Sequence, residues 1–122
     1  VNFAAPETVP EHYRGRTLYR HNPQITLMRT TLEENVRMAK WIAAKLNQME
    51  GEVRLLIPAG GVSAIDVPGQ PFHDPAADQA LFDTLEQRVQ ATPRRQVHRL
   101  PYAINDPEFA EALAASFRAI AS

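Results

Sequence analysis

The sequence predicts an α/β protein in which three strands alternate with three helices in the order βαβαβα. Two short apolar segments, partly β-branched, and a third short segment at residues 95–100 are each followed by a stretch whose apolar residues repeat at spacings of three and four. Glycines and prolines separate the two kinds of segment. Strands that alternate with helices of this length usually pair in parallel through right-handed crossovers, so we expect a small parallel sheet covered by helices.

Residues 1–23 are expected to be an irregular lead-in, because three prolines and a glycine interrupt any regular period. The α/β domain is then expected over residues 24–122. Three strands make a thin sheet, which a short strand at residues 1–3 or strands from another domain would complete. The first residue is Val1 rather than Met, so we also expect that an upstream domain of a longer protein is absent from this chain.

The first strand and helix are expected between residues 24 and 51. Residues 24–28 are apolar and partly β-branched, as a buried strand is. Thr31 and Glu34 have the spacing of a capping box, so a helix should begin there. Gly51 follows the last apolar repeat and is expected to end this helix. The predicted apolar stripe consists of Leu32, Val36, Ala39, Ile42, Ala43, Leu46 and Met49.

The second unit begins with an apolar strand at residues 53–57, closed by Pro58. Residues 59–73 have neither a helical nor a strand period and form an unusually long loop. Asp74 and Pro75 then have the pattern of an N-cap followed by the first helical position. The helix should run to about residue 90 and bury Leu81, Leu85 and Val89, with Phe82 flanking them.

The third strand is expected at residues 95–100, ending at Pro101. Asp106 and Pro107 repeat the cap and proline pair and open the last helix. One face of that helix should consist of Phe109, Leu113, Phe117 and Ile120.

The candidate site lies at the carboxyl ends of these strands, where open parallel sheets bind ligands. Gly60 and Gly61 allow backbone N–H groups to turn toward an anion, and Ser63 adds a hydroxyl donor. If all three strands are parallel, Arg29 and Thr30 reach the same point beside the start of the first helix. The alternative is that the glycines only turn the chain and that Arg29 is an ordinary surface charge.

Four further residues are weaker candidates for ligand binding. His21 and His73 lie at loop ends, where either could act as a general base or be an ordinary hydrogen-bonded histidine. Asp66 and Asn105 lie in the same loops and have no evident structural role. No histidine pair has metal-ligand spacing, so no metal site is predicted.

Several function classes are disfavoured by composition. The net charge of −1 provides no basic field for nucleic acid or an anionic membrane. The absence of cysteine excludes thiol catalysis and Cys-based metal centres. The two lysines, Lys40 and Lys45, lie well inside a helix, so no P-loop exists. Neither a membrane span nor a signal peptide is evident, so a cytoplasmic location is the default expectation.

Seven segments stand out in combination: residues 1–3, 7–10, 15–17, 21–31, 58–63, 68–75 and 104–107. Together they resemble the carboxyl-terminal part of a two-domain bacterial and fungal family of uncharacterised function, which is related to the amino-terminal region of the tomato mosaic virus resistance protein. The resemblance implies a Rossmann-like form of the α/β fold and an amino-terminal partner domain outside this chain. It also implies ATP as a candidate cofactor, because the plant relative binds ATP, but it supplies no catalytic residues.

Three hypotheses for function follow, in this order. The first is the ligand-binding half of a two-domain protein that binds a phosphate- or carboxylate-bearing small molecule in the cleft between its domains. The second is a protein-interaction and homo-oligomerisation module without small-molecule chemistry. The third is an enzyme in which His21 or His73 is the general base and the glycine loop holds an anion.

Overall fold

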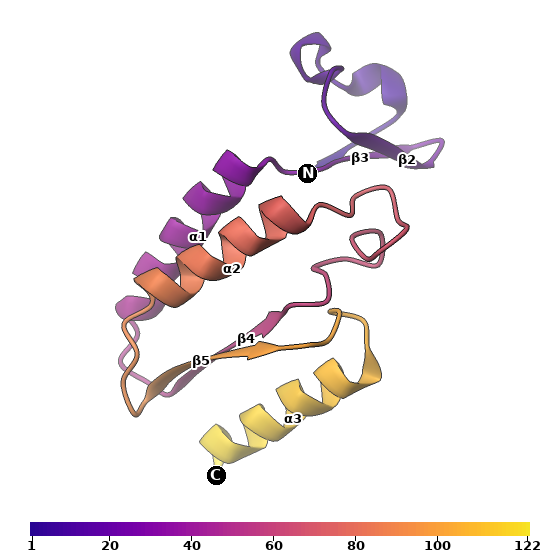
Figure 1. Ribbon diagram of the computed structural model, residues 1–122. Coiled ribbons are helices and arrows are strands. Elements are labelled where there is room, and N and C mark those ends of the chain that lie inside the picture. Colours follow the sequence, from indigo (N-terminus) through magenta and orange to yellow (C-terminus); the bar gives the residue numbers. More distant parts are fainter. The chain divides into compact units, whose positions relative to one another are not determined.

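The computed structural model describes residues 1–122, and its internal contacts divide the chain into two units, Val1–Thr31 and Leu32–Ser122 (Figure 1). Each unit has its own sheet. The sheet of the first unit is antiparallel and that of the second is parallel.

The first unit is a three-stranded sheet with the strand order β1-β3-β2. Its strands are β1 (Asn2–Phe3), β2 (Leu18–Asn22) and β3 (Ile25–Met28), and two short 3-10 turns at Pro6–Thr8 and Glu11–Tyr13 connect β1 to β2. The hairpin between β2 and β3 is fixed in part by the Asn22 side chain, whose Oδ1 accepts the N–H of Gln24 at 2.8 Å.

The prediction that the strand at residues 24–28 is parallel to the other two is wrong. This strand, β3, pairs antiparallel with both β1 and β2. The reason lies in β2, whose sequence Leu-Tyr-Arg-His-Asn is mostly polar and falls within the stretch that was expected to be irregular. Most of β2 is solvent-exposed, so it carries no apolar period that would mark it as a strand.

The second unit is built on two parallel strands with helices on both faces. The strands pair in register from Val53↔Arg95 to Pro58↔Leu100. Helices α1 and α2 pack against each other on one face, and α3 lies on the other (Figure 1). The α/β fold class is therefore confirmed. The elements are α1 (Leu32–Asn47), β4 (Val53–Pro58), α2 (Pro75–Arg88), β5 (Arg95–Leu100) and α3 (Pro107–Ala121).

The core of this unit lies between the sheet and the pair of helices. Its centre is made of Ala39, Ile57, Phe82 and Leu85, all at most 5% exposed. Phe82 was expected only to flank the buried face of α2, but it is a central core residue. Burial of aromatic and aliphatic side chains is the main source of stability in a domain of this size.

Helix α3 is less buried than its pattern predicted. Phe109 is 3% exposed, but Leu113 is 46% and Phe117 is 68% exposed. A sheet of only two strands offers a narrow surface, so it cannot cover the whole apolar face of a helix that crosses it. The expected face of α3 therefore exists in the sequence but is only partly buried.

The two predicted aspartate caps have different outcomes. Asp74 is confirmed, because its carboxylate accepts the N–H of Ala77 at 3.1 Å at the start of α2. Asp106 occupies the N-cap position of α3 but makes no side-chain cap bond. Its carboxylate instead accepts the N–H of Ala103 at 2.8 Å, so it stabilises the turn before the helix.

Candidate functional site

The candidate site is the carboxyl edge of β4 and β5, where residues 59–74 and 101–106 leave the sheet. The two segments continue the pairing of the strands, because Gly61 forms a parallel bridge with Ala103. The N–H of Gly60 donates to the carbonyl of Tyr102 at 2.9 Å, and the N–H of Ile104 donates to the carbonyl of Gly61 at 2.9 Å. The edge is therefore one connected structure rather than two independent loops.

Both glycines of this edge are required by the path of the chain. A Cβ at position 60 would lie 2.5 Å from the backbone nitrogen of Ala103. Gly61 has φ of +141°, and a Cβ there would collide with the carbonyl oxygen of Asp66. The N–H of Gly61 donates to the Pro58 carbonyl at 3.1 Å, so both glycine N–H groups are occupied. An anion held by these two N–H groups would have to displace existing hydrogen bonds. Anion binding by the Gly60 and Gly61 backbone stays a prediction.

Asp66 is the buried centre of the loop. It is 1% exposed, and its carboxylate accepts the N–H of Val62 at 3.0 Å and that of Asp74 at 3.4 Å. These contacts join the beginning of the loop to its end. No structural role for Asp66 was evident from the sequence, but the geometry supplies one, since a carboxylate accepts backbone N–H groups strongly in a buried setting.

Three polar side chains are left on this edge with donors or acceptors to offer. Ser63 is half-buried, and its Oγ accepts the N–H of Ile65 at 3.3 Å, which leaves the hydroxyl hydrogen available. His73 and Asn105 are exposed, and no protein group forms a hydrogen bond with either side chain. All three belong to the second unit and lie on the two segments, residues 59–74 and 101–106, that leave its carboxyl edge.

The remaining predicted residues belong to the first unit. His21 is exposed on β2, and its ring centroid lies 6.4 Å from that of Tyr19. Arg29 is 9% exposed and directly follows β3; its N–H donates to the Thr17 carbonyl at 2.9 Å. Thr30 is half-buried. The convergence of Arg29 and Thr30 with the glycine loop stays a prediction.

Two buried polar residues in the first turns of α1 and α2 were missed by the sequence analysis. Asn35 is 1% exposed and donates from Nδ2 to the Ala77 carbonyl at 2.9 Å, while its Oδ1 has no partner. Asp78, in the first turns of α2, is 7% exposed. In the sequence, each of these residues is only a polar position within an apolar helical repeat. Such a position does not by itself show whether the side chain is buried or solvated.

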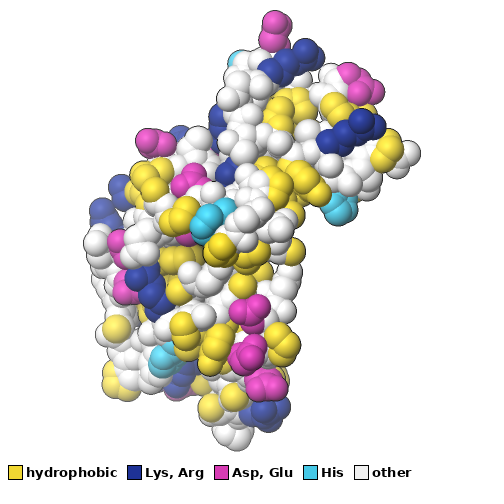
Figure 2. Space-filling view, turned by 45° about the vertical axis from the view of Figure 1, so that its right-hand side comes forward, with side chains coloured by type: hydrophobic (Ala, Val, Ile, Leu, Met, Phe, Trp, Pro, Cys, Tyr) yellow, Lys and Arg dark blue, Asp and Glu magenta, His cyan; other side chains and the backbone are white.

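Three further observations concern surface charge, the apolar length of the helices and metal ligands. Lys and Arg side chains are interspersed with Asp and Glu over the face shown in Figure 2, so they form no extended field of one sign. No helix is both long enough and apolar enough to cross a bilayer. No group of three or more His, Cys, Asp or Glu side chains is arranged to hold a metal ion.

Comparison with known proteins places the chain in a family. A model of the C-terminal domain of the uncharacterised protein family UPF0261 matches residues 1–121. A UPF0261 protein of Rhizobium meliloti (strain 1021) is 60% identical over 122 residues, which is all of this chain and 31% of that protein. A UPF0261 protein of Mesorhizobium japonicum is 51% identical over 115 residues, or 94% of this chain and 29% of that protein.

A plant relative extends the comparison. The ToMV resistance protein Tm-1(GCR237) of Solanum lycopersicum is 45% identical over 117 residues, or 96% of this chain and 16% of that protein. The chain thus spans about a third of the length of the two bacterial relatives and about a sixth of the tomato protein. The resemblance inferred from the sequence is confirmed: the chain belongs to the uncharacterised protein family UPF0261 and matches its C-terminal domain.

Proposed function

We propose that this chain binds a small molecule with a phosphate or carboxylate group at the carboxyl edge of β4 and β5, as the ligand-binding half of a two-domain protein. The observation that carries the proposal is the fixed loop at residues 59–74. Buried Asp66 holds both of its ends, and the Gly61↔Ala103 bridge attaches it to the next loop. Long loops that are fixed in this way commonly carry binding residues.

The donors of the proposed site are side chains. The hydroxyl of Ser63, the imidazole of His73 and the amide of Asn105 can each donate to an oxyanion, and none of these donors is used by another protein group. Backbone donors from Gly60 and Gly61 contribute less than the sequence suggested, because each already has a carbonyl partner. The predicted roles of Arg29 and Thr30 as the cation and the hydroxyl of this site assumed three parallel strands, whereas β3 is antiparallel. A nucleotide such as ATP is one candidate ligand. We also propose that the protein is located in the cytoplasm.

A thermal-shift screen of nucleotides, sugar phosphates and carboxylic acids tests this function, because a ligand of the native state raises the unfolding midpoint. We expect at least one class of compound to raise the midpoint of the chain. The response should be lost in Ser63→Ala, His73→Ala and Asn105→Ala combined. His98→Ala is the matched control, since His98 is exposed on β5 and bonds only to Gln96. No response to any compound, or an equal response in the triple variant, refutes the proposal.

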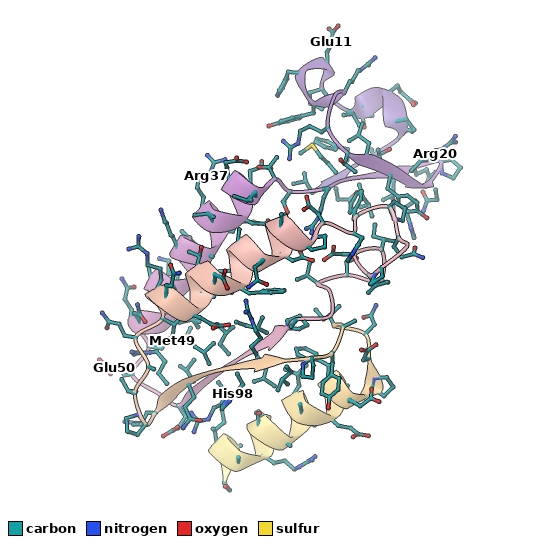
Figure 3. The ribbon with its side chains drawn as sticks, viewed as in Figure 1. Glu11, Arg20, Arg37, Met49, Glu50 and His98 are labelled. Atoms are coloured by element: carbon teal, nitrogen blue, oxygen red, sulfur yellow. The ribbon has the colours of Figure 1, made fainter.

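A second candidate function is a protein-interaction and homo-oligomerisation module. It is favoured by large apolar side chains on the surface of α1, where Trp41 is 65% and Met38 is 41% exposed. They line an apolar hollow together with Arg37, which Figure 3 labels on this helix, and Ile42. Light scattering over a wide range of concentrations tests this candidate. A mass that stays at 13.7 kDa contradicts homo-oligomerisation, whereas a mass that rises in the wild type but not in Trp41→Gln supports it.

A further inference from the structure

A second hollow, with a partly polar lining, lies at the end of the second unit opposite the carboxyl edge of the strands, between the carboxyl-terminal ends of α1 and α2. Its volume is about 290 Å³. Met49 and Glu50 mark this end of α1 in Figure 3. The hollow is remote in the fold from the carboxyl edge of the strands, because the helices of a βαβ unit run antiparallel to its strands. Its lining residues are Lys40, Ala43, Ala44, Asn47, Arg88 and Gln90.

Helix carboxyl ends normally repel anions, because their unpaired carbonyl groups carry partial negative charge. Here a cation lies beside these ends. The guanidinium of Arg95 donates to the carbonyls of Asn47 at 3.0 Å, Met49 at 2.9 Å and Gln90 at 3.2 Å. One side chain thus pairs with the last carbonyl of α1 and with one carbonyl just beyond each helix, and it adds a full positive charge beside them.

The walls of the hollow are held at a fixed spacing by Asn47. Its Nδ2 donates to the Arg88 carbonyl at 2.9 Å, and its Oδ1 accepts the N–H of Gln90 at 2.8 Å. Ala43 lines the hollow and is 1% exposed. Its methyl side chain is too short to fill the space between the helices. The hollow therefore exists before any ligand binds, which lowers the cost of binding.

Two cations line this hollow without a carboxylate partner. The side chains of Lys40 and Arg88 are exposed and form no ion pair or hydrogen bond with the rest of the chain. Other arginines of the same unit do have such partners: Arg54 and Arg94 pair with Glu52, and Arg99 pairs with Asp83 and Glu86. The side-chain amide of Gln90 also has no protein partner, so a third donor is available.

We infer that this hollow binds the phosphate group of a small molecule between Lys40 and Arg88. A guanidinium can donate two parallel hydrogen bonds to a phosphate, and an ammonium adds a point charge from the other helix. Gln90 completes the set with an amide donor, while Ala43 and Ala44 leave room for a small apolar part of the ligand. The site shares no residue with the carboxyl edge, so it stands or falls independently of the proposed function.

The test is a titration of the ¹⁵N-labelled chain with inorganic phosphate at constant ionic strength, followed by amide chemical shifts. We expect saturable shifts at Ala43, Ala44 and Gln90. Lys40→Ala and Arg88→Ala should each weaken binding by about tenfold, the loss expected for one charge-assisted contact. Lys45→Ala is the matched control, because it removes the same charge from the same helix but Lys45 lies over the Trp41 ring, outside the hollow.

The phosphate titration has several results that would contradict binding between Lys40 and Arg88. Unchanged affinity in both Lys40→Ala and Arg88→Ala overturns the inference, and so does an equal loss in Lys45→Ala. Shifts confined to residues 63–73 and 105 would also overturn it, while supporting the carboxyl edge instead. A response to succinate as strong as that to phosphate refutes the assignment of a phosphate ligand. The amide spectrum of each variant shows directly whether it is folded.

Discussion

Gly61→Ala is the substitution that we expect to destabilise the chain most among its five glycines. Two independent effects add at this position. The φ of +141° is unfavourable for any residue with a Cβ, at about 1 to 2 kcal/mol. The new Cβ also collides with the backbone carbonyl of Asp66, which cannot rotate away as a side chain would, and overpacking of this kind costs about 1 to 3 kcal/mol. We therefore expect a loss of about 2 to 5 kcal/mol in the free energy of unfolding.

Three other glycines separate these two effects. Gly69 has φ of +85° but open space around a new Cβ, so Gly69→Ala should show the backbone effect alone, about 1 to 2 kcal/mol. Gly60 has no unusual φ but lies against Ala103, so Gly60→Ala should show the steric effect alone, about 1 to 3 kcal/mol. Gly15 has neither, and Gly15→Ala should change stability by less than about 1 kcal/mol.

Urea unfolding followed by circular dichroism gives the four free energies on one scale. We expect the loss of stability to be largest for Gly61→Ala, intermediate for Gly60→Ala and Gly69→Ala, and smallest for Gly15→Ala. If Gly61→Ala were as stable as Gly15→Ala, the close approach of residue 61 to Asp66 would be wrong. A Gly60→Ala variant with an unchanged free energy of unfolding would likewise contradict the pairing of the two loops at the carboxyl edge.

Further predictions concern individual polar side chains; the first two are measured by the same urea unfolding and the third by hydrogen exchange. Asp66→Ala should cost about 2 to 4 kcal/mol, because two partly buried N–H groups lose a charged acceptor, and a loss below about 1 kcal/mol would contradict its role. Asp74→Ala should cost about 0.5 to 2 kcal/mol through the cap of α2, and a neutral effect would show that the cap contributes nothing. Arg95→Met should speed hydrogen exchange of amides in the last turns of α1 and α2; unchanged exchange would show that the guanidinium does not stabilise those ends.

The helices were predictable because their apolar residues repeat with the helical period, and the strand at 53–57 because it is a short apolar run. These elements and the strand at 95–100 occur close to the expected positions. The pairing of residues 24–28 was not predictable, because its partner β2 is polar and exposed and the sequence shows only a proline-rich stretch. Strand pairing depends on contacts between segments, which the period of one segment does not report.

In the candidate site, too, features of a single segment were predictable and contacts between distant residues were not. The sequence located the two loops at the carboxyl edge correctly, since position follows from strand order. It did not assign a role to Asp66, whose two N–H partners at positions 62 and 74 become neighbours only when the loop folds. The hollow between Lys40 and Arg88 was missed for the same reason, because these cations are far apart in sequence and are joined only by the packing of α1 on α2.

The central claim is that the carboxyl edge of β4 and β5 binds a small anionic molecule. The most direct measurement is an amide chemical-shift map of the labelled chain with the compound that most raises its unfolding midpoint. We predict saturable shifts at residues 63–66, 73 and 103–105, with α3 beyond its first turn unaffected. Shifts that fall only outside these segments, or their survival unchanged in the Ser63, His73 and Asn105 triple variant, would contradict the claim.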